Sequence, residues 1–521
     1  MNDLDAVYRY HDGTKHHFHR FARSLGYLDW ASQPNPFRTY RDAPQHPLSP
    51  RPDAPRSPIG GVLRHSLGLS AWKRYHTSHW SLRVNPSSGN LHPTEAYVIS
   101  GSGVFHYAPD RHALERRCAF ASDLPGECFL AALTSIHWRE AWKYGERAFR
   151  YCQHDLGHAI AAVVIAAGHE GLTARLLPEW PQREIGALTG IDRDEDFADA
   201  EREEAGCLMV LGPSSLVLGP SSLLDAVRVG TWTGRASQLS EDHVQWTFID
   251  EVARATEDRG RARPSTLRQA QGRPEPNRGT TSSGRTSPDN ALALSPSKGE
   301  HYPKAVILQR RSALALDGRS SISADAFFSM LSRLLPSEAP PWTALWWTPR
   351  IHLALFVHRV DGVEPGLYLL PRDAQTVDRL RAACRREFSW TRVTTDLPLV
   401  ALAHGDCRHL SARVSCDQDV AADGFFSLGM IADFDASLQE LGPSFYRHLF
   451  WESGVVGQVL YLEAEAAGAR GTGIGCFYDD PVHDVLGLTD HAFQSLYHFT
   501  AGIPVEDTRL TTEPGYEWEL T

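Results

Sequence analysis

Two stretches of apolar and polar residues predict a matching pair of β-hairpins. Residues 95–110, "EAYVISGSGVFHYAPD", form two apolar runs around a Gly-Ser-Gly turn, and residues 353–373, "LALFVHRVDGVEPGLYLLPRD", repeat this arrangement. Short β-branched and aromatic runs separated by glycine are typical of strands joined by a tight turn. Each hairpin leads to a proline, so each is expected to continue into an amphipathic helix.

A long apolar helix is predicted over residues 154–172, "HDLGHAIAAVVIAAGHEGL", because small and apolar residues occupy nearly every face. A helix that is apolar all round is buried, so this one is expected to lie between layers or between subunits. The predicted strands are few and are separated by helices, which favours an α+β layered domain.

The two parts of the chain resemble each other. Residue n and residue n + 297 agree in type at seven positions, four of them glycine, which predicts a tandem repeat of one domain of roughly 200 residues. The recurring arginine and the recurring acid are expected to form structural ion pairs or helix caps. The matched pairs are Gly145/Gly442, Phe149/Tyr446, Arg150/Arg447, Asp155/Glu452, Gly157/Gly454, Gly171/Gly468 and Gly190/Gly487.

The expected boundaries are a first domain at residues 1–240, a connecting segment at 241–300 and a second domain at 301–521. No aromatic residue occurs from Asp250 to His301, and residues 263–300 are rich in Pro, Ser, Gly, Thr and Arg. A segment of that composition cannot bury enough apolar surface to order itself. The connecting segment is therefore expected to hold a helix followed by a disordered linker.

Composition narrows the class of protein. Of 521 residues, 42% are hydrophobic, which is enough for a large core, and the formal net charge of −11 argues against a nucleic-acid binder, which needs a basic face. No run approaches the roughly 18 apolar residues of a membrane helix. The first residues lack the apolar stretch of a signal peptide. A soluble, cytoplasmic protein is expected.

Cysteine and histidine spacing gives no sign of a metal site. The eight cysteines are scattered without a Cys-x-x-Cys pair, which is typical of reduced thiols and not of disulfides or zinc ligands. His16, His17 and His19 have no acidic or thiol partner nearby in the sequence. We therefore expect no metal.

The segment before the first hairpin, "RVNPSSGNLHPTEAY" at residues 83–97, raises two possibilities. Proline, serine, glycine and asparagine favour a plain turn. The same residues suit a ligand cradle, because glycine lets the backbone approach a ligand and the hydroxyls and amide supply hydrogen bonds.

Four segments together resemble the FMN-dependent nitroreductase superfamily and, within it, the SagB-type azoline dehydrogenases. That resemblance implies subunits with a layered α-β-α fold that pair with FMN bound between them. The segments are "RVNPSSGNLHPTEAYV" (83–98), "KYGERAFRYCQHDLGH" (143–158), "QRRSALALDGR" (309–319) and "RGTGIGCFYDDPVHDVLGL" (470–488).

The resemblance assigns three groups of residues to FMN. Arginine pairs with phosphate oxygens through charge-assisted hydrogen bonds, so the Arg-Arg-Ser group would bind the phosphate; alternatively it is a solvated helix start. The Pro-Ser-Ser-Gly-Asn loop would meet the flavin ring or ribityl chain, and the glycine-rich loop would let the cofactor come close; alternatively these are a capped turn and a bulged edge strand. The residues are Arg310, Arg311 and Ser312; Pro86, Ser87, Ser88, Gly89 and Asn90; and Gly471, Gly473, Ile474 and Gly475.

The two halves keep complementary parts. The second half has the Arg-Arg-Ser group and the glycine loop, but only Pro336 and Ser337 where the Pro-Ser loop is expected. The first half has that loop, but "ARLLPEW" (174–180) in place of the glycine loop. We therefore expect two tandem nitroreductase-like copies that form an intramolecular pseudo-dimer with one intact FMN site and one degraded site.

Lys143 and Tyr144 are the candidate catalytic pair. The resemblance implies that they assist proton removal while the flavin accepts hydride from an azoline ring. A lysine acts as a base only when burial or nearby cations lower its pKa, and Arg139 and Arg147 lie one turn away on either side. The alternative is a solvated charged helix face with ion pairs one turn apart.

The expected function is that of an FMN-dependent oxidoreductase that dehydrogenates azoline rings in modified peptides. Its substrate would be a small molecule or a peptide, and its partners other peptide-modification proteins. Two alternatives stay open: an NAD(P)H-dependent reductase of nitro compounds or quinones, and a flavin-free scaffold in a peptide-modification complex.

Overall fold

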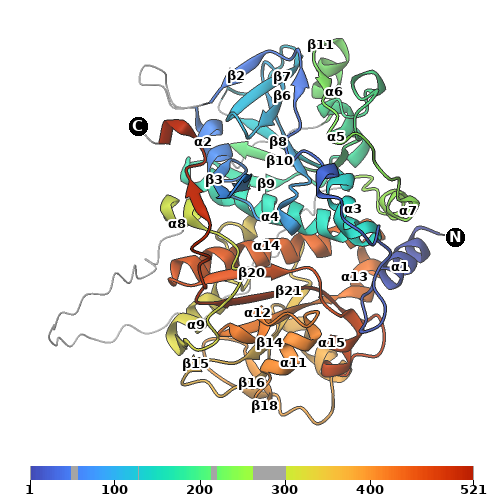
Figure 1. Ribbon diagram of the computed structural model, residues 1–521. Helices are drawn as coiled ribbons and strands as arrows, with labels where there is room; N and C mark the ends of the chain where they lie inside the picture. Colours follow the sequence, from blue (N-terminus) through green and yellow to red (C-terminus); the bar gives the residue numbers. More distant parts are fainter. Residues whose placement is uncertain (1, 49–56, 127, 213–219, 262–300, 520–521) are drawn as a thin grey trace, which may run out of the picture.

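The computed structural model describes residues 2–48, 57–126, 128–212, 220–261 and 301–519 (Figure 1). The helix expected in the connecting segment is α7, Thr247–Ala255. The linker expected after it, residues 263–300, lies outside the described residues. Among the helices that the structure describes, none is long and apolar enough to cross a membrane.

Each half of the chain contains one mainly antiparallel sheet. In the first half the strand order is β11-β7-β6-β5-β8-β10-β9, with β2 also pairing with β7. Its hairpin is β5 and β6, as the sequence predicts. The strands are β2 (Gln45–Pro47), β5 (Thr94–Ser100), β6 (Gly103–Ala108), β7 (Ala113–Ala119), β8 (Phe129–Ser135), β9 (Thr173–Leu176), β10 (Glu204–Gly212) and β11 (Thr231–Trp232).

The sheet of the second half has the order β17-β18-β16-β14-β19-β21-β20. Its six strands from β18 to β20 follow one another as β7 to β9 do in the first half, so the two halves share a topology. The strands are β14 (Ile351–Val357), β16 (Gly366–Leu370), β17 (Thr391–Arg392), β18 (Val400–His404), β19 (Phe426–Asp433), β20 (Arg470–Ile474) and β21 (Phe493–Gly502).

The helix expected after each hairpin forms in the second half only. There the helix is α10, Val377–Ala383. In the first half the prediction is wrong, because residues 113–119 form strand β7, paired along its length with β6. Its sequence, "ALERRCA", is rich in helix formers, but Glu115 and Arg117 are buried and paired with His106 and Asp196. Those buried contacts override local helix propensity.

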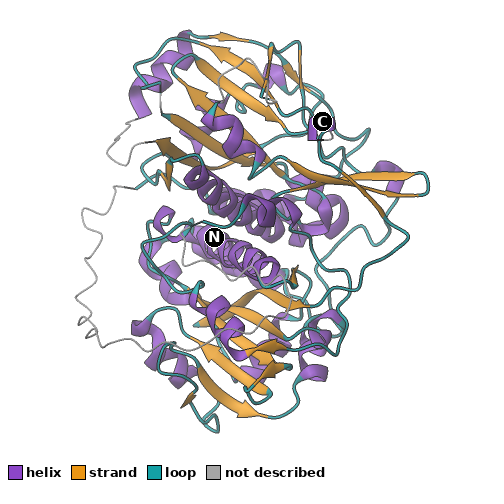
Figure 2. Cartoon of the chain, turned by 90° about the vertical axis from the view of Figure 1, so that its left-hand side faces the viewer, coloured by secondary structure: helices purple, strands orange, loops and turns teal. Residues whose placement is uncertain are grey.

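Two long helices, α4 (Ala148–His169) and α14 (Phe445–Ala466), lie side by side between the two sheets (Figures 1 and 2). Both are almost entirely buried, as predicted for the first of them. They touch at Gly157 and Gly454, where a Cβ atom on either glycine would overlap the backbone of the other helix. The molecule is thus layered as sheet, helix pair and sheet, and one hydrophobic core crosses both halves.

Each end of the chain packs on the other half. Helix α1, Asp3–Gly13, reaches the second half, where His11 is hydrogen-bonded to Gln494 at 2.9 Å. At the other end, β22 (Thr511–Glu513) pairs with β3 (Leu69–Tyr75), which pairs in turn with β4 (Ser78–Arg83). The two halves are therefore interlocked.

Shorter elements complete the layers. The remaining helices are α2 (Pro58–Arg64), α3 (His137–Tyr144), α5 (Gln182–Thr189), α6 (Pro220–Val229), α8 (Lys304–Gln309), α9 (Ala324–Ser332), α11 (Arg408–Val414), α12 (Val420–Asp423), α13 (Phe434–Leu441) and α15 (Asp479–Leu486). Two small two-stranded sheets pair β1 (Tyr40–Arg41) with β12 (Arg235–Ala236), and β13 (Ile322–Ser323) with β15 (Val360–Asp361).

Candidate functional site

A cavity of about 480 Å³ lies where the two halves meet. The first half contributes the loop before β5 and one side of α4, and the second half contributes the segment after α8 and strand β20. The cavity brings together twelve of the fourteen candidate residues; Lys143 and Gly471 are not part of its lining. The candidates on its wall are Pro86, Ser87, Ser88, Gly89, Asn90, Tyr144, Arg310, Arg311, Ser312, Gly473, Ile474 and Gly475.

The Pro-Ser-Ser-Gly-Asn loop is held by its own side chains. Ser87 Oγ accepts from His92 N at 2.8 Å, and the Asn90 amide donates to Ser81 O at 2.9 Å. Gly89 and Asn90 have φ angles of 59° and 60°, a left-handed conformation that glycine and asparagine tolerate best. The loop is thus a fixed turn that also lines the cavity, so the two sequence alternatives are compatible.

Asp155, on α4, holds this loop through hydrogen bonds. Its carboxylate accepts hydrogen bonds from Ser88 N at 3.1 Å and from Ser88 Oγ at 3.0 Å. Burial raises the pKa of Asp155 to about 7, against the opposing effect of hydrogen bonds from Ser87 and Ser88. Asp155 is therefore a cavity-lining carboxyl group that exchanges a proton near neutral pH. The expected partner Arg150 instead pairs with Asp479.

One end of the cavity is mainly cationic. Its lining includes Lys73, Arg310, Arg311 and Arg470, and also Glu506 and Asp507. Glu506 pairs with Arg470 at 2.6 Å. Arg310 is fixed by donating from Nε to Val84 O at 2.9 Å and from Nη2 to Arg83 O at 3.0 Å. Arg310 Nη1 and Arg470 Nε are buried and have no hydrogen-bond partner among the described residues.

Arg311 adds to this charge. It donates from Nη2 to Ser70 O at 3.0 Å and from Nη1 to Leu308 O at 2.8 Å. Burial, followed by the charge of Arg310, lowers the pKa of Arg311 to about 10. Closely spaced guanidinium groups that repel one another and leave donors unused suit an anionic ligand such as a phosphate. Arg310 is buried, Arg311 is half-buried and Ser312 is exposed. The group follows the end of α8, so it is not a helix start.

The glycine-rich strand β20 makes room for aromatic rings. A Cβ atom on Gly471, Gly473 or Gly475 would overlap Phe499, Tyr497 or Tyr151, respectively. Strand β20 lies at the edge of its sheet, as the alternative expected, but it pairs with β21 in an unbroken register and has no bulge. The alternating glycines therefore place two tyrosines, Tyr151 and Tyr497, on the cavity wall.

Ser312 and Tyr461 connect the glycine strand to the cationic end. Ser312 Oγ is hydrogen-bonded to Tyr461 OH at 2.9 Å, and Tyr461 OH accepts from Gly473 N at 2.8 Å. The Arg310 guanidinium lies 5.0 Å from the centre of the Tyr461 ring. Gly471 lies just outside the wall, where its carbonyl accepts from Ala313 N at 3.0 Å. These contacts fix the cations relative to β20.

Helix α3 ends at the cavity with Lys143 and Tyr144. Tyr144 OH and Lys143 Nζ would lie 2.7 and 3.3 Å from a Cβ atom built on Gly89, so both side chains reach the Pro-Ser loop. Lys143 Nζ is 5.3 Å from the centre of the Tyr144 ring. Burial raises the pKa of Tyr144 well above its usual value.

The charged residues around Lys143 do not form a solvated helix face, so that alternative is wrong. Arg139, Glu140 and Arg147 are all buried. Arg139 pairs with Glu95, and Arg147 with Asp479 at 2.9 Å. The two arginines expected to act on Lys143 are thus neutralised by carboxylates.

Glu140 is a functional candidate that the sequence pattern does not reveal. Its two carboxyl oxygens are buried and have no hydrogen-bond partner among the described residues. Burial, and then the charge of Asp155, raise the pKa of Glu140 well above its usual value. Two carboxyl groups with raised pKa values therefore lie beside Lys143 and Tyr144. In the sequence Glu140 is indistinguishable from a surface residue of a charged helix.

Comparisons with known proteins bear on the fold. No protein-family model matches the chain. A crystal structure described as a "putative nitroreductase" from Anabaena variabilis superposes with a TM-score of 0.68 and 20% identity, over 96% of this chain and 99% of that chain. The chain has a nitroreductase-like fold.

Two further similarities are shorter. "Putative nitroreductase MJ1384" of Methanocaldococcus jannaschii is 29% identical over 116 residues, which is 18% of this chain. The chain thus spans only 58% of the length of this curated relative. A chain of the E. coli microcin synthetase McbBCD complex aligns with 44% of this chain at 16% identity and a TM-score of 0.29, which is too low to bear on function.

The second half has a region that matches this cavity by strand register, and we call the two matching regions the first and the second crevice. By strand register, Thr94 faces Ser135 on β8 and Ile351 faces Ala432 on β19. Residues 345–347, Leu-Trp-Trp, therefore correspond to Ser88–Asn90. The counterpart expected at Pro336 and Ser337 is wrong, because those residues lie far upstream of β14.

Tryptophan rings fill this second crevice. Trp347 donates from Nε1 to Glu452 at 2.9 Å, and Trp346 and Trp347 pack against the rings of Phe445 and His448. Glu452 also pairs with the buried Arg372. The expected partner of Glu452, Arg447, pairs with Glu204 instead.

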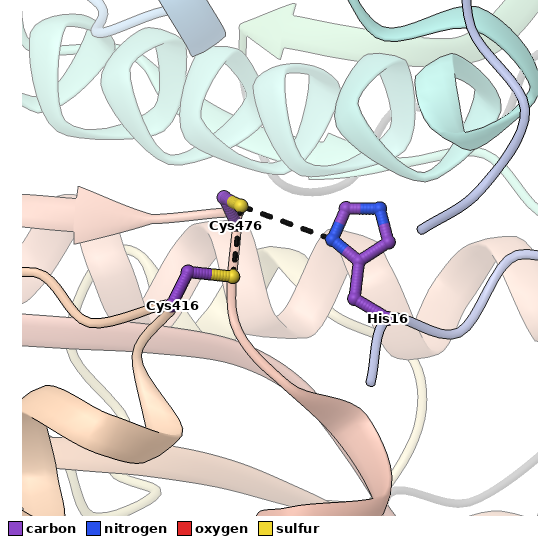
Figure 3. Close-up of side chains that lie close together, drawn as sticks. All are labelled: His16, Cys416 and Cys476. Atoms are coloured by element: carbon purple, nitrogen blue, oxygen red, sulfur yellow. Dashed lines mark hydrogen bonds between the residues drawn. The ribbon is translucent and has the colours of Figure 1, made fainter. Parts of the chain in front are cut away.

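Sequence spacing also misses a cluster of His16, Cys416 and Cys476, shown in Figure 3. Cys476 follows the glycine strand and lines the cavity. The three residues come from segments separated by up to 460 positions, so no local motif could reveal them.

Proposed function

We propose that the chain is an FMN-dependent oxidoreductase and that its two halves form an intramolecular pseudo-dimer with one FMN site. The observation that carries the proposal is the cavity itself, which unites the Arg-Arg-Ser group of the second half with the Pro-Ser loop of the first half. Bound FMN would supply reversible two-electron chemistry by accepting or giving a hydride.

The cationic end of the cavity would hold the FMN phosphate. Arg310 and Arg311 are held by carbonyl oxygens, so their charges are already in place before a ligand binds. The free Nη1 of Arg310 and Nε of Arg470 are the donors that a phosphate oxygen would satisfy. A pre-arranged donor set lowers the entropic cost of binding.

The other end would receive the flavin ring and the substrate. Gly89 leaves room beside Tyr144 and Lys143, and Tyr151 and Tyr497 offer aromatic surface. The Ser87 and Ser88 hydroxyls already make hydrogen bonds, to His92 N and to Asp155 on α4. The loop would therefore meet the cofactor through its backbone and Gly89.

The finer proposal is the dehydrogenation of an azoline ring in a peptide or small molecule. Removing hydrogen next to a ring nitrogen needs a group that takes the proton. Tyr144 reaches the cavity, Lys143 lies against the Tyr144 ring, and the Asp155 carboxyl exchanges a proton near pH 7. We assign proton transfer to Tyr144 and Lys143, with Asp155 and Glu140 as the nearby acids.

A test of the cofactor site compares two arginines. Arg311→Ala should weaken FMN binding at least tenfold, measured by quenching of flavin fluorescence on titration. The matched control is Arg359→Ala, since Arg359 also donates to backbone carbonyls, those of Ala422 and Gly424, but lies outside the cavity lining. A purified protein that binds no FMN, or equal affinity in both variants, would refute the assignment.

A test of the finer proposal uses Lys143→Ala. This variant should keep FMN but lose about 10²-fold or more in azoline oxidation, the usual size of a proton-transfer contribution. Wild-type turnover in the variant would exclude Lys143 from the reaction. Fast bleaching of the flavin by NAD(P)H would instead favour a nitro or quinone reductase, the activity suggested by the name of the curated relative.

A further inference from the structure

Cys416 and Cys476 bring their sulfur atoms to 2.9 Å from each other, beside the imidazole of His16 (Figure 3). The His16 Nδ1 atom is 3.8 Å from the Cys476 sulfur. Cys476 lies on the cavity wall directly after Gly475, and Cys416 lies in the turn between α11 and α12. The other six cysteines are buried, whereas these two are partly exposed.

The backbone around the pair is held tightly. Gln418 donates from its amide to both Ser415 O at 2.7 Å and Cys476 O at 2.9 Å, which ties the two cysteine segments together. Tyr478 N donates to Val414 O at 2.8 Å, which adds a second tie. The closeness of the sulfurs is therefore fixed by the fold and does not depend on side-chain rotation alone.

His16 is fixed to the same segment. Its backbone N–H donates to the Asp479 carboxylate at 2.8 Å, and Asp479 N donates to His16 O at 3.0 Å. Burial lowers the pKa of His16, so at neutral pH its imidazole is uncharged and can accept a thiol proton.

Cys416 carries backbone strain. Its φ angle is 58° and that of the following Asp417 is 56°, so two successive residues other than glycine adopt the left-handed conformation. Residues other than glycine rarely adopt this conformation, and those that do are concentrated at functional sites.

The two thiols differ in acidity. The hydrogen bond from Cys416, together with His16 and Arg147, lowers the pKa of Cys476 to about 5 and raises the pKa of Cys416. A thiolate is the attacking species in thiol–disulfide exchange. Cys407 makes a useful comparison: it also lies near a histidine, His358 at 3.6 Å, but burial raises the pKa of Cys407 to about 12.

The sulfur separation favours bond formation over metal binding. Two thiolates on a tetrahedral zinc, each about 2.3 Å from the ion, lie roughly 3.8 Å apart. A disulfide needs a separation of about 2.05 Å. At 2.9 Å the sulfurs are closer than zinc ligands, and a movement of less than about 1 Å would join them.

We propose that Cys476 and Cys416 are a redox-active dithiol that reduces an organic disulfide entering the cavity. Cys476, present as a thiolate, attacks one sulfur of the substrate; a new S–S bond forms, the substrate S–S bond breaks, and one substrate thiolate leaves and takes up a proton from solvent. Cys416 then loses its proton and attacks the Cys476 sulfur, so the Cys416–Cys476 bond forms and the second thiol leaves. The protein dithiol is oxidised by two electrons and the substrate disulfide is reduced to two thiols. This activity does not depend on flavin.

The test treats the full-length reduced protein with DTNB, an aromatic disulfide whose released thiolate is yellow. The wild type should release two thiolates per chain in a fast phase, and peptide mapping should find Cys416 linked to Cys476. Cys416→Ser should release one thiolate and keep the aryl group on Cys476, which mass spectrometry detects. Cys476→Ser should lose the fast phase.

Cys407→Ser is the matched control and should react as the wild type does. The wild-type peptide map requires no substitution, so a variant that fails to fold does not leave the proposal untested. The proposal is overturned if the map contains no Cys416–Cys476 link, or if Cys476 reacts no faster than Cys407. It is also overturned if the purified protein holds one zinc per chain that protects both thiols from DTNB.

Discussion

The two matching regions of the halves, the first and the second crevice, differ in what lies beside the acid on the long helix. In the first, the acid on α4, Asp155, accepts hydrogen bonds from a loop of small residues, and a cavity remains. In the second, the acid at the matching position on α14, Glu452, accepts from Trp347 and pairs with Arg372. A homodimer has two identical crevices because both subunits share one sequence. A single chain whose two halves differ in sequence can keep a cavity in one crevice and pack aromatic side chains into the other.

The first prediction concerns the two acids and has the largest expected effect. Glu452→Gln should destabilise the protein by about 4 kcal/mol, because it leaves the Arg372 guanidinium buried without its counter-charge. Asp155→Asn should cost less than about 1 kcal/mol, because no cation among the described residues pairs with Asp155 and an amide oxygen can still accept from Ser88. Denaturant unfolding of the two variants measures the difference. Equal losses in the free energy of unfolding would mean that Asp155 and Glu452 contribute equally to stability.

The contact between the two long helices gives the second prediction. Gly157→Ala should cost about 3 kcal/mol, since its Cβ atom would overlap the Trp451 backbone of the opposite helix. In the control Gly186→Ala, the nearest atom is Ile191 Cγ1 at 3.8 Å, so higher helix propensity should make the change neutral or stabilising. Thermal unfolding distinguishes the two. A harmless Gly157→Ala would rule out close contact between α4 and α14.

The third prediction is a pH dependence that only the open crevice should show. The folded-state pKa of Asp155, about 7, is above its unfolded value, so its contribution to stability is fully present below about pH 4 and is lost as the pH rises through 7. The free energy of unfolding of the wild type relative to Asp155→Asn should therefore fall by roughly 2 kcal/mol between pH 5 and pH 8. Glu140 faces Asp155 and is present in both proteins, so the comparison cancels much of its effect. If the difference in free energy of unfolding between the wild type and Asp155→Asn does not change with pH, the pKa of Asp155 is not raised.

The fourth prediction has the smallest effect and concerns the loop that keeps the crevice open. Gly89→Ala should weaken FMN binding about tenfold, or about 1.4 kcal/mol, because its Cβ atom would come within 2.7 Å of Tyr144 OH. Gly362→Ala is the control: Gly362 also has a positive φ, 79°, but has no atom near its Cβ position. Both variants should lose similar stability, and only the first should lose affinity. If Gly89→Ala and Gly362→Ala bind FMN equally well, Gly89 is not part of the cofactor site.

Patterns within one element could be predicted from the sequence, and contacts between distant elements could not. The hairpins and the buried helix follow from apolar periodicity and glycine placement. The strand at residues 113–119 could not be foreseen, because the buried partners of Glu115 and Arg117 lie on other elements. The helix contact at Gly157 and Gly454 was visible only as a matched pair of glycines.

The same distinction between local patterns and distant contacts holds for the residues of the cavity. Motif resemblance predicted which residues line the cavity, but not how they use their side chains. The hydroxyls of Ser87 and Ser88 hold the loop, and the alternating glycines of β20 accommodate Tyr497 and Phe499. Glu140 looks like a surface charge in the sequence because burial depends on what packs over it. Cys416 and Cys476 meet only because separate turns converge.

Helix α1 and strand β22, at the two ends of the chain, limit how a substrate can reach the cavity. Because α1 contacts the second half and β22 pairs with β3, moving the two halves apart would break both contacts. Under the proposed function, a peptide substrate would therefore reach the cavity without separation of the halves. The length of peptide that can enter the cavity would then decide which rings react.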